Sequence, residues 1–365
     1  MHLRSQPASP SSAAATWFAV TLVALPAPRV PEHAPESASA NAVSSRAGAP
    51  TAPACDLLLP DADTIVVADW DHRAHVSHDR GATWEAHPLH LWSRDMTVGT
   101  NGDYWSLYYW RRTHGEASVA SLAYSRNRGR VWTEVEWPVG VGGHVELAMP
   151  VDFLTPASEE PIVLDDLGRC WRHERWGPES FASWKPIGAF IPREVGARGF
   201  RFAVCGVACS TNLLVAAGGD VWLGTRGATS WTATHGPNAV ALETIPRAHE
   251  EEPERVVAVT RDGELFVFEL ATNAWRRLGA VPFRDASVFG LATTAQGLWP
   301  CGGAAGKPIG SWMDFAGRWH ELAGLPAHGQ SNAIRTAPNG RVGLACGGVY
   351  LASADGTRWE QVWPK

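Results

Sequence analysis

Ser77-His78-Asp79-Arg80-Gly81-Ala82-Thr83-Trp84 is an octet whose pattern, Ser-x-Asp-x-Gly-x-Thr-Trp, returns along the chain in worn but readable form. Its serine and aspartate can hydrogen-bond nearby backbone groups and so hold a turn. Its glycine takes a backbone conformation that other residues resist, and its tryptophan returns the chain to a core. The octet therefore predicts a self-stabilised turn between two strands.

Further copies of the octet lie downstream. The second copy, 125–132, keeps Ser125, Gly129 and Trp132 in register and has Asn127 and Val131 in place of aspartate and threonine. A copy one residue shorter, 353–359, contains Ser353, Asp355 and Trp359, and the stretch 225–231 resembles it. Weaker versions end in Trp184, Trp275 and Trp319.

The tryptophans that close these units are spaced by 40 to 52 residues. They are Trp84, Trp132, Trp184, Trp231, Trp275, Trp319 and Trp359. A period of this length is typical of propeller blades. We therefore predict an all-β fold, a single seven-bladed β-propeller of four-stranded antiparallel blades joined by these turns.

Strand-like segments fill the space between the turns. In the second unit, alternating stretches at 95–99, 104–110, 119–125 and 131–137 predict four strands, with a hairpin at Asn101-Gly102. The last unit repeats this plan at 332–337, 341–347, 349–353 and 358–363. The fifth and sixth units show the same alternation, including an Arg261-Asp262-Gly263 turn, and helical periodicity is nearly absent.

Composition restricts the class of protein. The 365 residues are 45% hydrophobic and 19% charged, which suffices for a substantial core. The formal net charge is −6, and no dense stripe of lysine and arginine is present, which argues against a nucleic-acid partner. No stretch reaches the ~18 apolar residues of a membrane-spanning helix. We expect a monomer.

Residues 1–54 differ in kind from the rest. A short apolar run, 13–25, follows Arg4 and has the size of a signal-peptide core, so 1–28 is interpreted as a signal segment and the protein as exported. A disordered leader or a start codon placed too early is the alternative. Residues 29–54 are rich in Pro, Ala and Ser and read as a linker, which leaves 55–365 for the propeller.

The six cysteines form no dense framework and no zinc-binding pair. Cys301 and Cys346 each precede Gly-Gly and occupy the same position in successive units, so they are expected to be buried thiols. Pairing of Cys205 with either Cys209 or Cys170 is left open. We predict no metal site and no cofactor.

The octet resembles the Asp-box, or bacterial neuraminidase repeat, and the chain from about 55 to 365 is similar to sialidase-like and photosystem II assembly/stability factor-like propellers. The resemblance implies that the turns join third and fourth strands on one face of the ring. It places ligands on the opposite face, built from loops between second and third strands and between blades. The photosystem II assembly/stability factor-like propellers are non-catalytic binding scaffolds, which the resemblance implies for this chain as well.

On that expected ligand face, the binding candidates are Trp70, Asp71, Arg111, Arg112 and Arg193. Asp165, Asp166, Arg198, Arg201 and Asp262 are placed on the same face. Arginines, carboxylates and tryptophans around a propeller mouth could hold an anionic or sugar ligand. The plainer interpretation is that these loops are polar because they contact water.

An enzymatic interpretation requires more than the turns. A sialidase needs an arginine triad, a tyrosine nucleophile assisted by glutamate, and an aspartate acid/base. The five tyrosines, Tyr104, Tyr108, Tyr109, Tyr124 and Tyr350, all fall in predicted strands, and Arg73 is the sole arginine of the predicted propeller before Ser77.

The first hypothesis is therefore an exported, non-catalytic scaffold for a protein or glycan partner. The second is a sialidase-like glycoside hydrolase using Asp71 or Asp165 as its acid, and the third is a degenerate relative that binds sugar on the aromatic run 104–110.

Overall fold

The structure of the protein is a computed structural model. It describes residues 52–89, 92–99, 102–110, 119–135, 150–153, 162–165, 170–174, 183–186, 203–225, 231–247, 249, 251–354 and 356–364. Every described residue belongs to one compact unit, Ala47–Lys365. The expected signal segment and nearly all of the expected linker lie outside the described residues.

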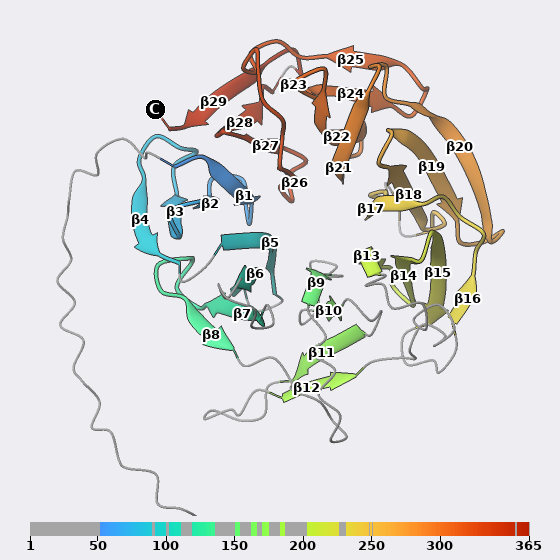
Figure 1. Ribbon diagram of the computed structural model, residues 1–365, viewed down its shortest axis with the longest axis horizontal. Coiled ribbons are helices and arrows are strands. Elements are labelled where there is room, and N and C mark those ends of the chain that lie inside the picture. The colour runs from blue at the N-terminus through green and yellow to red at the C-terminus, as the bar shows by residue number, and fades with distance from the viewer. Residues whose placement is uncertain are drawn as a thin grey trace, which may run out of the picture. The chain divides into compact units, whose positions relative to one another are not determined.

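The described residues form a β-propeller of four-stranded antiparallel blades and contain no helix (Figure 1). It follows that no described helix could cross a membrane. The strands assemble into seven antiparallel sheets, one of which carries an additional short strand, β23. Apart from β23, which pairs with β22 alone, the strands of each sheet pair in the order of the chain, so every sheet is a meander built from one continuous segment.

The first three sheets comprise β1 (Ala54–Leu58), β2 (Ile65–Asp69), β3 (Arg73–Ser77) and β4 (Glu85–Pro88); β5 (Trp92–Val98), β6 (Tyr104–Trp110), β7 (Val119–Ser125) and β8 (Thr133–Val135); β9 (Pro150–Phe153), β10 (Ile162–Asp165), β11 (Cys170–Glu174) and β12 (Ser183–Pro186). The next two comprise β13 (Ala203–Ala208), β14 (Asn212–Ala217), β15 (Asp220–Thr225) and β16 (Trp231–Ala233); β17 (Ala239–Thr244), β18 (Arg255–Thr260), β19 (Glu264–Glu269) and β20 (Ala274–Ala280). The last two comprise β21 (Ala286–Thr293), β22 (Gly297–Ala304), β23 (Lys307–Pro308), β24 (Ser311–Asp314) and β25 (Trp319–Glu321); β26 (Ala333–Thr336), β27 (Val342–Cys346), β28 (Gly348–Ala352) and β29 (Trp359–Trp363).

The first strands of the sheets lie around the centre and contact one another in ring order (Figure 1). The order of contacts is β1, β5, β9, β13, β17, β21, β26 and again β1. The tryptophans that close the sequence units lie in, or directly before, the outermost strands β4, β8, β12, β16, β20, β25 and β29. Each of these tryptophans therefore lies close to the start of an outermost strand.

The core consists of apolar clusters shared between adjacent sheets. Val66 and Ala74 of the first sheet pack with Met96 and Tyr104 of the second in one such cluster. Another joins β13 and β14 to β17 and β18 around the fully buried Phe268. Because a single sheet cannot cover both of its faces, this sharing is what buries them.

The ring closes between the first and last sheets without exchanging strands. The Ala54 amide donates to the Gly347 carbonyl at 3.1 Å. Trp363 of β29, 1% exposed, packs in a cluster with Leu57 and Val67 of the first sheet. Its ring lies 5.1 Å from that of the buried His75. Side-chain packing therefore provides most of this closure.

The octet forms the connection between β3 and β4 by means of its own side chains. Ser77 Oγ donates to Asp79 Oδ1 at 2.8 Å and accepts from the Gly81 amide at 2.7 Å. Asp79 also accepts from the amide and the hydroxyl of Thr83, at 2.8 and 2.6 Å. These hydrogen bonds lower the pKa of Asp79 to about 2, and the bond from the Thr83 hydroxyl has the largest effect. Trp84 Nε1 donates to the Gly81 carbonyl at 3.1 Å.

The second octet reproduces this geometry with asparagine in place of aspartate. Asn127 Oδ1 accepts from Ser125 Oγ at 2.9 Å and from the Val131 amide at 2.8 Å. The Gly129 amide donates to Ser125 Oγ, and Trp132 Nε1 donates to the Gly129 carbonyl. In the shorter C-terminal turn, Ser353 Oγ accepts from the Arg358 amide at 3.1 Å, while Asp355 lies outside the described residues.

The octet glycines also let one sheet approach the preceding one. Gly81 has φ +85°, and a Cβ there would lie 2.9 Å from Val362 Cβ of the last sheet. Gly129 has φ +87°, and a Cβ there would lie 2.9 Å from Val76 Cγ2 of the first sheet. A side chain at either site would meet both unfavourable backbone torsions and a neighbouring sheet.

All six cysteines are buried thiols, and none forms a disulfide. This confirms the expectation for Cys301 and Cys346. Pairing of Cys205 with Cys209 or Cys170, which the sequence left open, does not occur. Burial raises the pKa of the Cys301 thiol to about 12 and that of Cys346 to about 11, so both remain protonated at neutral pH.

Candidate binding face and central ion pairs

Antiparallel pairing divides the connections between two sides of the ring. The start of each first strand pairs with the end of the second, as Ala239 does with Thr260. Links between sheets therefore lie on the same side as the loops between second and third strands. We call this side the loop face, and the side that carries the octet turns the turn face.

Trp70 and Asp71 lie on the loop face, in the connection between β2 and β3. Asp69 holds this connection: its Oδ1 accepts from the amides of Asp71 and Arg73, each at 2.9 Å. Its Oδ2 lies 2.7 Å from Nε2 of the buried His75. Trp70 is 45% exposed, which is unusual for a large apolar side chain. A fixed loop therefore presents an indole ring to solvent.

The other predicted binding residues are not brought together by the described structure. Arg111, Arg112 and Arg193 lie outside the described residues, as do Asp166, Arg198 and Arg201. Asp165 is the last residue of β10, and its backbone pairs with Pro150. Their proposed role in binding remains a prediction.

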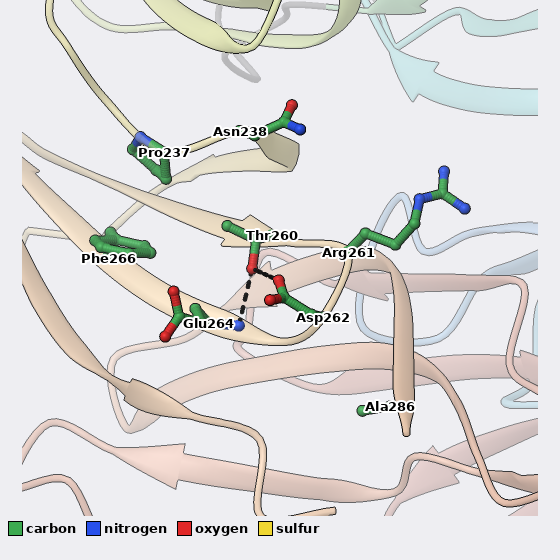
Figure 2. Close-up of a pocket in the computed structure, with 8 residues that line it drawn as sticks. All are labelled: Pro237, Asn238, Thr260, Arg261, Asp262, Glu264, Phe266 and Ala286. Atoms are coloured by element: carbon green, nitrogen blue, oxygen red, sulfur yellow. Dashed lines mark hydrogen bonds between the residues drawn. The ribbon is translucent and has the colours of Figure 1, made fainter. Parts of the chain in front are cut away.

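An open pocket of about 560 Å³ lies on the loop face between the fifth and sixth sheets (Figure 2). Its lining comes from the link that precedes β17, from the hairpin between β18 and β19, and from the start of β21. The lining residues are Pro237, Asn238, Thr260, Arg261, Asp262, Glu264, Phe266 and Ala286. Asp262, placed on this face by the sequence, is one of them.

The hairpin at the floor of the pocket is fixed by its own hydrogen bonds. Thr260 Oγ1 donates to Asp262 Oδ1 and accepts from the Glu264 amide (Figure 2). Gly263 has φ +87°, and its amide donates to the Thr260 carbonyl at 3.0 Å. These contacts resemble those of the octet, with threonine in place of serine. The carboxylate of Asp262 is thereby held in a defined position.

The charged groups around the pocket are engaged to different extents. Glu264 Oε1 accepts from Nε and Nη2 of Arg277, at 3.2 and 2.9 Å. The guanidinium of Arg261 lies 5.9 Å from the ring centre of Phe289, which is 37% exposed on β21. In Figure 2 Arg261 and Asn238 extend away from the Asp262 carboxylate. Asp262 Oδ2 accepts no hydrogen bond from a described residue.

A second polar arrangement lies at the centre of the ring. Arg335 Nη2 of β26 donates to Asp56 Oδ1 of β1 at 3.2 Å and to Asp95 Oδ1 of β5 at 2.6 Å. Asp56 is fully buried, and its Oδ2 accepts from Ser93 Oγ, which in turn accepts from Ser106 Oγ. One arginine therefore joins the last sheet to the first two.

Burial dominates the titration of the central carboxyls. Desolvation raises the pKa of Asp56 to about 6, against the opposing effect of Arg335. It raises the pKa of Glu243 on β17 to about 7, and Asp95 adds to the increase while Arg335 opposes it. Glu243 retains some solvent contact. Asp56 and Asp95 share one arginine, an arrangement that suits structural cross-linking better than acid/base catalysis.

Sequence reasoning missed both arrangements, apart from Asp262. Pro237 lies in the link before β17 and Phe266 lies on β19, and Asp56 and Arg335 are 279 positions apart. No local pattern marks either pair. Among the described residues, no group of three metal-binding side chains could hold a metal ion.

No protein-family model and no curated protein sequence matches this chain. Solved structures do share its fold. A streptogramin B lyase matches with TM-score 0.59 and 10% identity over 82% of this chain and 93% of its own. YCF48 from Cyanidioschyzon merolae matches with TM-score 0.55 and 13% identity over 82% of this chain and 94% of its own.

A third solved structure is much longer than this chain. PorZ, a surface component of the type-IX secretion system of Porphyromonas gingivalis, matches with TM-score 0.57 and 11% identity over 86% of this chain. The match spans 38% of the PorZ chain. At such low sequence identities, these structural matches establish a β-propeller fold for this chain. They do not establish its activity.

Proposed function

We propose that this protein is a non-catalytic scaffold that holds an extended segment of a protein partner on its loop face. The observation that carries the proposal is the loop-face pocket, where the apolar Pro237 and Phe266 lie beside a carboxylate oxygen, Asp262 Oδ2, that accepts no hydrogen bond from a described residue. A concave site with apolar walls and a few placed polar groups is typical of binding sites. The exposed indole of Trp70, on a loop held by Asp69, adds an anchor on the same face.

Two further considerations support a protein ligand. YCF48, a propeller of the same fold, has been solved with a D1 peptide bound, with TM-score 0.53 and 13% identity to this chain. At the centre of the ring, Asp56 and Asp95 are both engaged by Arg335, so this pair does not provide the two unengaged carboxyls facing each other that the hydrolase hypothesis requires.

The proposal includes finer features carried over from the sequence. The seven sheets are counted as seven blades of one ring, and the turns at 77–84 and 125–132 as Asp-boxes. Asp71, Arg111, Arg112 and Arg193 are assigned to the binding face together with Trp70. The chain is assigned to the periplasm or the extracellular space on the strength of residues 1–28, and it is expected to be monomeric.

Site-specific cross-linking of the full chain tests the scaffold. A photo-reactive phenylalanine at Asn238 or Trp70 samples the loop face, and one at Val131, which is 60% exposed in an octet turn, samples the turn face. We expect a discrete cross-linked partner from the source cells at the first two positions and none at Val131. Equal cross-linking at all three positions would contradict the proposal.

Hydrolysis assays test the alternative of a glycoside hydrolase. The full chain is incubated with fluorogenic sialosides and neutral glycosides, beside Asp71→Asn and Asp165→Asn variants whose folding is checked by circular dichroism. We expect no turnover. Turnover that either variant abolishes would make the protein an enzyme, and a parallel glycan array separates sugar binding without hydrolysis from protein binding.

A further inference from the structure

The charges around the loop-face pocket point to the kind of side chain that it takes. Asp262 is exposed, and its Oδ1 is held by Thr260, which leaves Oδ2 without a hydrogen-bond donor among the described residues. A carboxylate oxygen that is fixed on one side and unengaged on the other is suited to accept from a cationic donor.

None of the charged groups nearby engages this oxygen. Arg261 neighbours Asp262 in the chain, but its guanidinium lies over the Phe289 ring and forms no ion pair with Asp262. Glu264 is paired with Arg277 through Oε1 alone, and its Oε2 accepts no hydrogen bond from a described residue. The pocket therefore presents two carboxylate oxygens, Asp262 Oδ2 and Glu264 Oε2, that accept no hydrogen bond from a described residue.

The apolar part of the lining fits the stem of a long basic side chain. Phe266 is partly buried, and its ring lies on the same side of the hairpin as the carboxylates of Asp262 and Glu264 (Figure 2). Lysine and arginine place methylene groups along apolar surface while the charged head reaches a polar group.

We propose that this pocket binds a lysine or arginine side chain of an extended peptide segment, with its head group at Asp262 and its methylenes against Phe266 and Pro237. The inference rests on the proposed scaffold function and adds the chemistry of the partner. The side-chain amide of Asn238, at the rim, is placed to bond the backbone of the same segment.

Capped hexapeptides test the inference on the full chain. Fluorescein-labelled peptides of Gly, Ala and Val carry Lys, Arg, norleucine, citrulline or Glu at one central position, and their Kd values are measured by fluorescence polarisation. Norleucine and citrulline keep the shape of lysine and arginine without the charge. We expect the charged peptides to bind about tenfold more tightly than these analogues, since a charge-assisted hydrogen bond is lost.

Matched variants assign the preference to the pocket. In Asp262→Asn the preference for Lys over norleucine should fall below about twofold, because the charge is lost while the shape is kept. Asp285→Asn removes a charge from the same face but outside the pocket lining, at φ 56°, a conformation that asparagine also adopts; it should leave the preference unchanged.

Several outcomes would overturn the inference. They are equal Kd values for Lys and norleucine, tighter binding of the Glu peptide, and a preference that survives in Asp262→Asn. Absence of binding by every peptide would overturn it as well. The cross-linking pattern at Asn238, Trp70 and Val131 then decides separately whether the scaffold proposal fails with it.

Discussion

Arg335 Nη2 lies 2.6 Å from Asp95 Oδ1, which ties the first strand of the last sheet to the first strand of the second sheet. The same nitrogen reaches Asp56 on the sheet between them at 3.2 Å. Asp56 is fully buried, so the arginine is its main compensation for lost hydration.

Arg335→Leu should therefore destabilise the protein strongly. Removing one partner of a buried pair typically costs about 3–5 kcal/mol, because the other charge is left uncompensated. Urea unfolding followed by tryptophan fluorescence measures the change. Arg277→Leu breaks an exposed pair with Glu264 and should cost about 1 kcal/mol or less. Equal effects of the two variants would mean that the central arginine has no special structural role.

Glu243 should make the protein less stable as the pH rises. Its pKa is raised from 4.5 to about 7 in the folded state, so the folded protein favours the protonated form. This contribution is fully present below the unfolded pKa and is lost as the pH rises through about 7.

Glu243→Gln should remove that loss. Between pH 5 and pH 8 the free energy of unfolding of the wild type should fall by about 1–2 kcal/mol more than that of the variant. This figure allows for the residual solvent contact of Glu243. Unfolding by urea at both pH values measures the difference, and Glu251→Gln, at an exposed position, is the control. A variant with the pH dependence of the wild type would show that Glu243 titrates normally.

Gly81→Ala should destabilise the protein by about 2–4 kcal/mol, from the left-handed backbone and from overpacking against the last sheet. Gly340 provides a matched control, since it has φ +82° but a Cβ placed on it would have no atom within 4 Å. Gly340→Ala should cost about 1–2 kcal/mol for the backbone alone. Thermal unfolding compares the two variants. Equal losses of stability would show that the contact with Val362 contributes nothing to the effect of Gly81→Ala.

Asp79→Asn should be tolerated much better than Asp79→Ala. The second octet uses Asn127 to accept the same bonds from serine and from the backbone, so an amide oxygen suffices for this turn. Alanine accepts neither bond and should lower the unfolding temperature clearly. An asparagine variant as unstable as the alanine variant would show that the charge of Asp79, and not its geometry, stabilises the turn.

The sequence predicted those parts of the fold that repeat or are local. The segments 104–110 and 119–125 coincide with β6 and β7, and the octet glycines adopt the positive φ expected of them. β17, 239–244, was not predicted, because its residues Ala-Val-Ala-Leu-Glu-Thr carry little β-branched signal and precede no recognisable turn. The repeat could locate the outermost strands but not every innermost one.

The sites were less predictable for a physical reason. Ring closure places Arg335 next to Asp56, and the packing of neighbouring sheets places Pro237 and Ala286 around one pocket. No local sequence pattern indicates either proximity. The expected loop face did contain Asp262, because the strand order alone fixes which turns share a side. Topology predicted the side on which the pocket lies, and packing determined its position there.

Closure between the first and last sheets has a consequence for synthesis on the ribosome. Leu57 and Val67 are among the first residues of the ring to be made, yet their cluster includes Val362 and Trp363, which are among the last. Until translation reaches those residues, the flank of the first sheet has no native cover. Nascent chains stalled before β29 would therefore expose an apolar surface that chaperones and proteases can recognise.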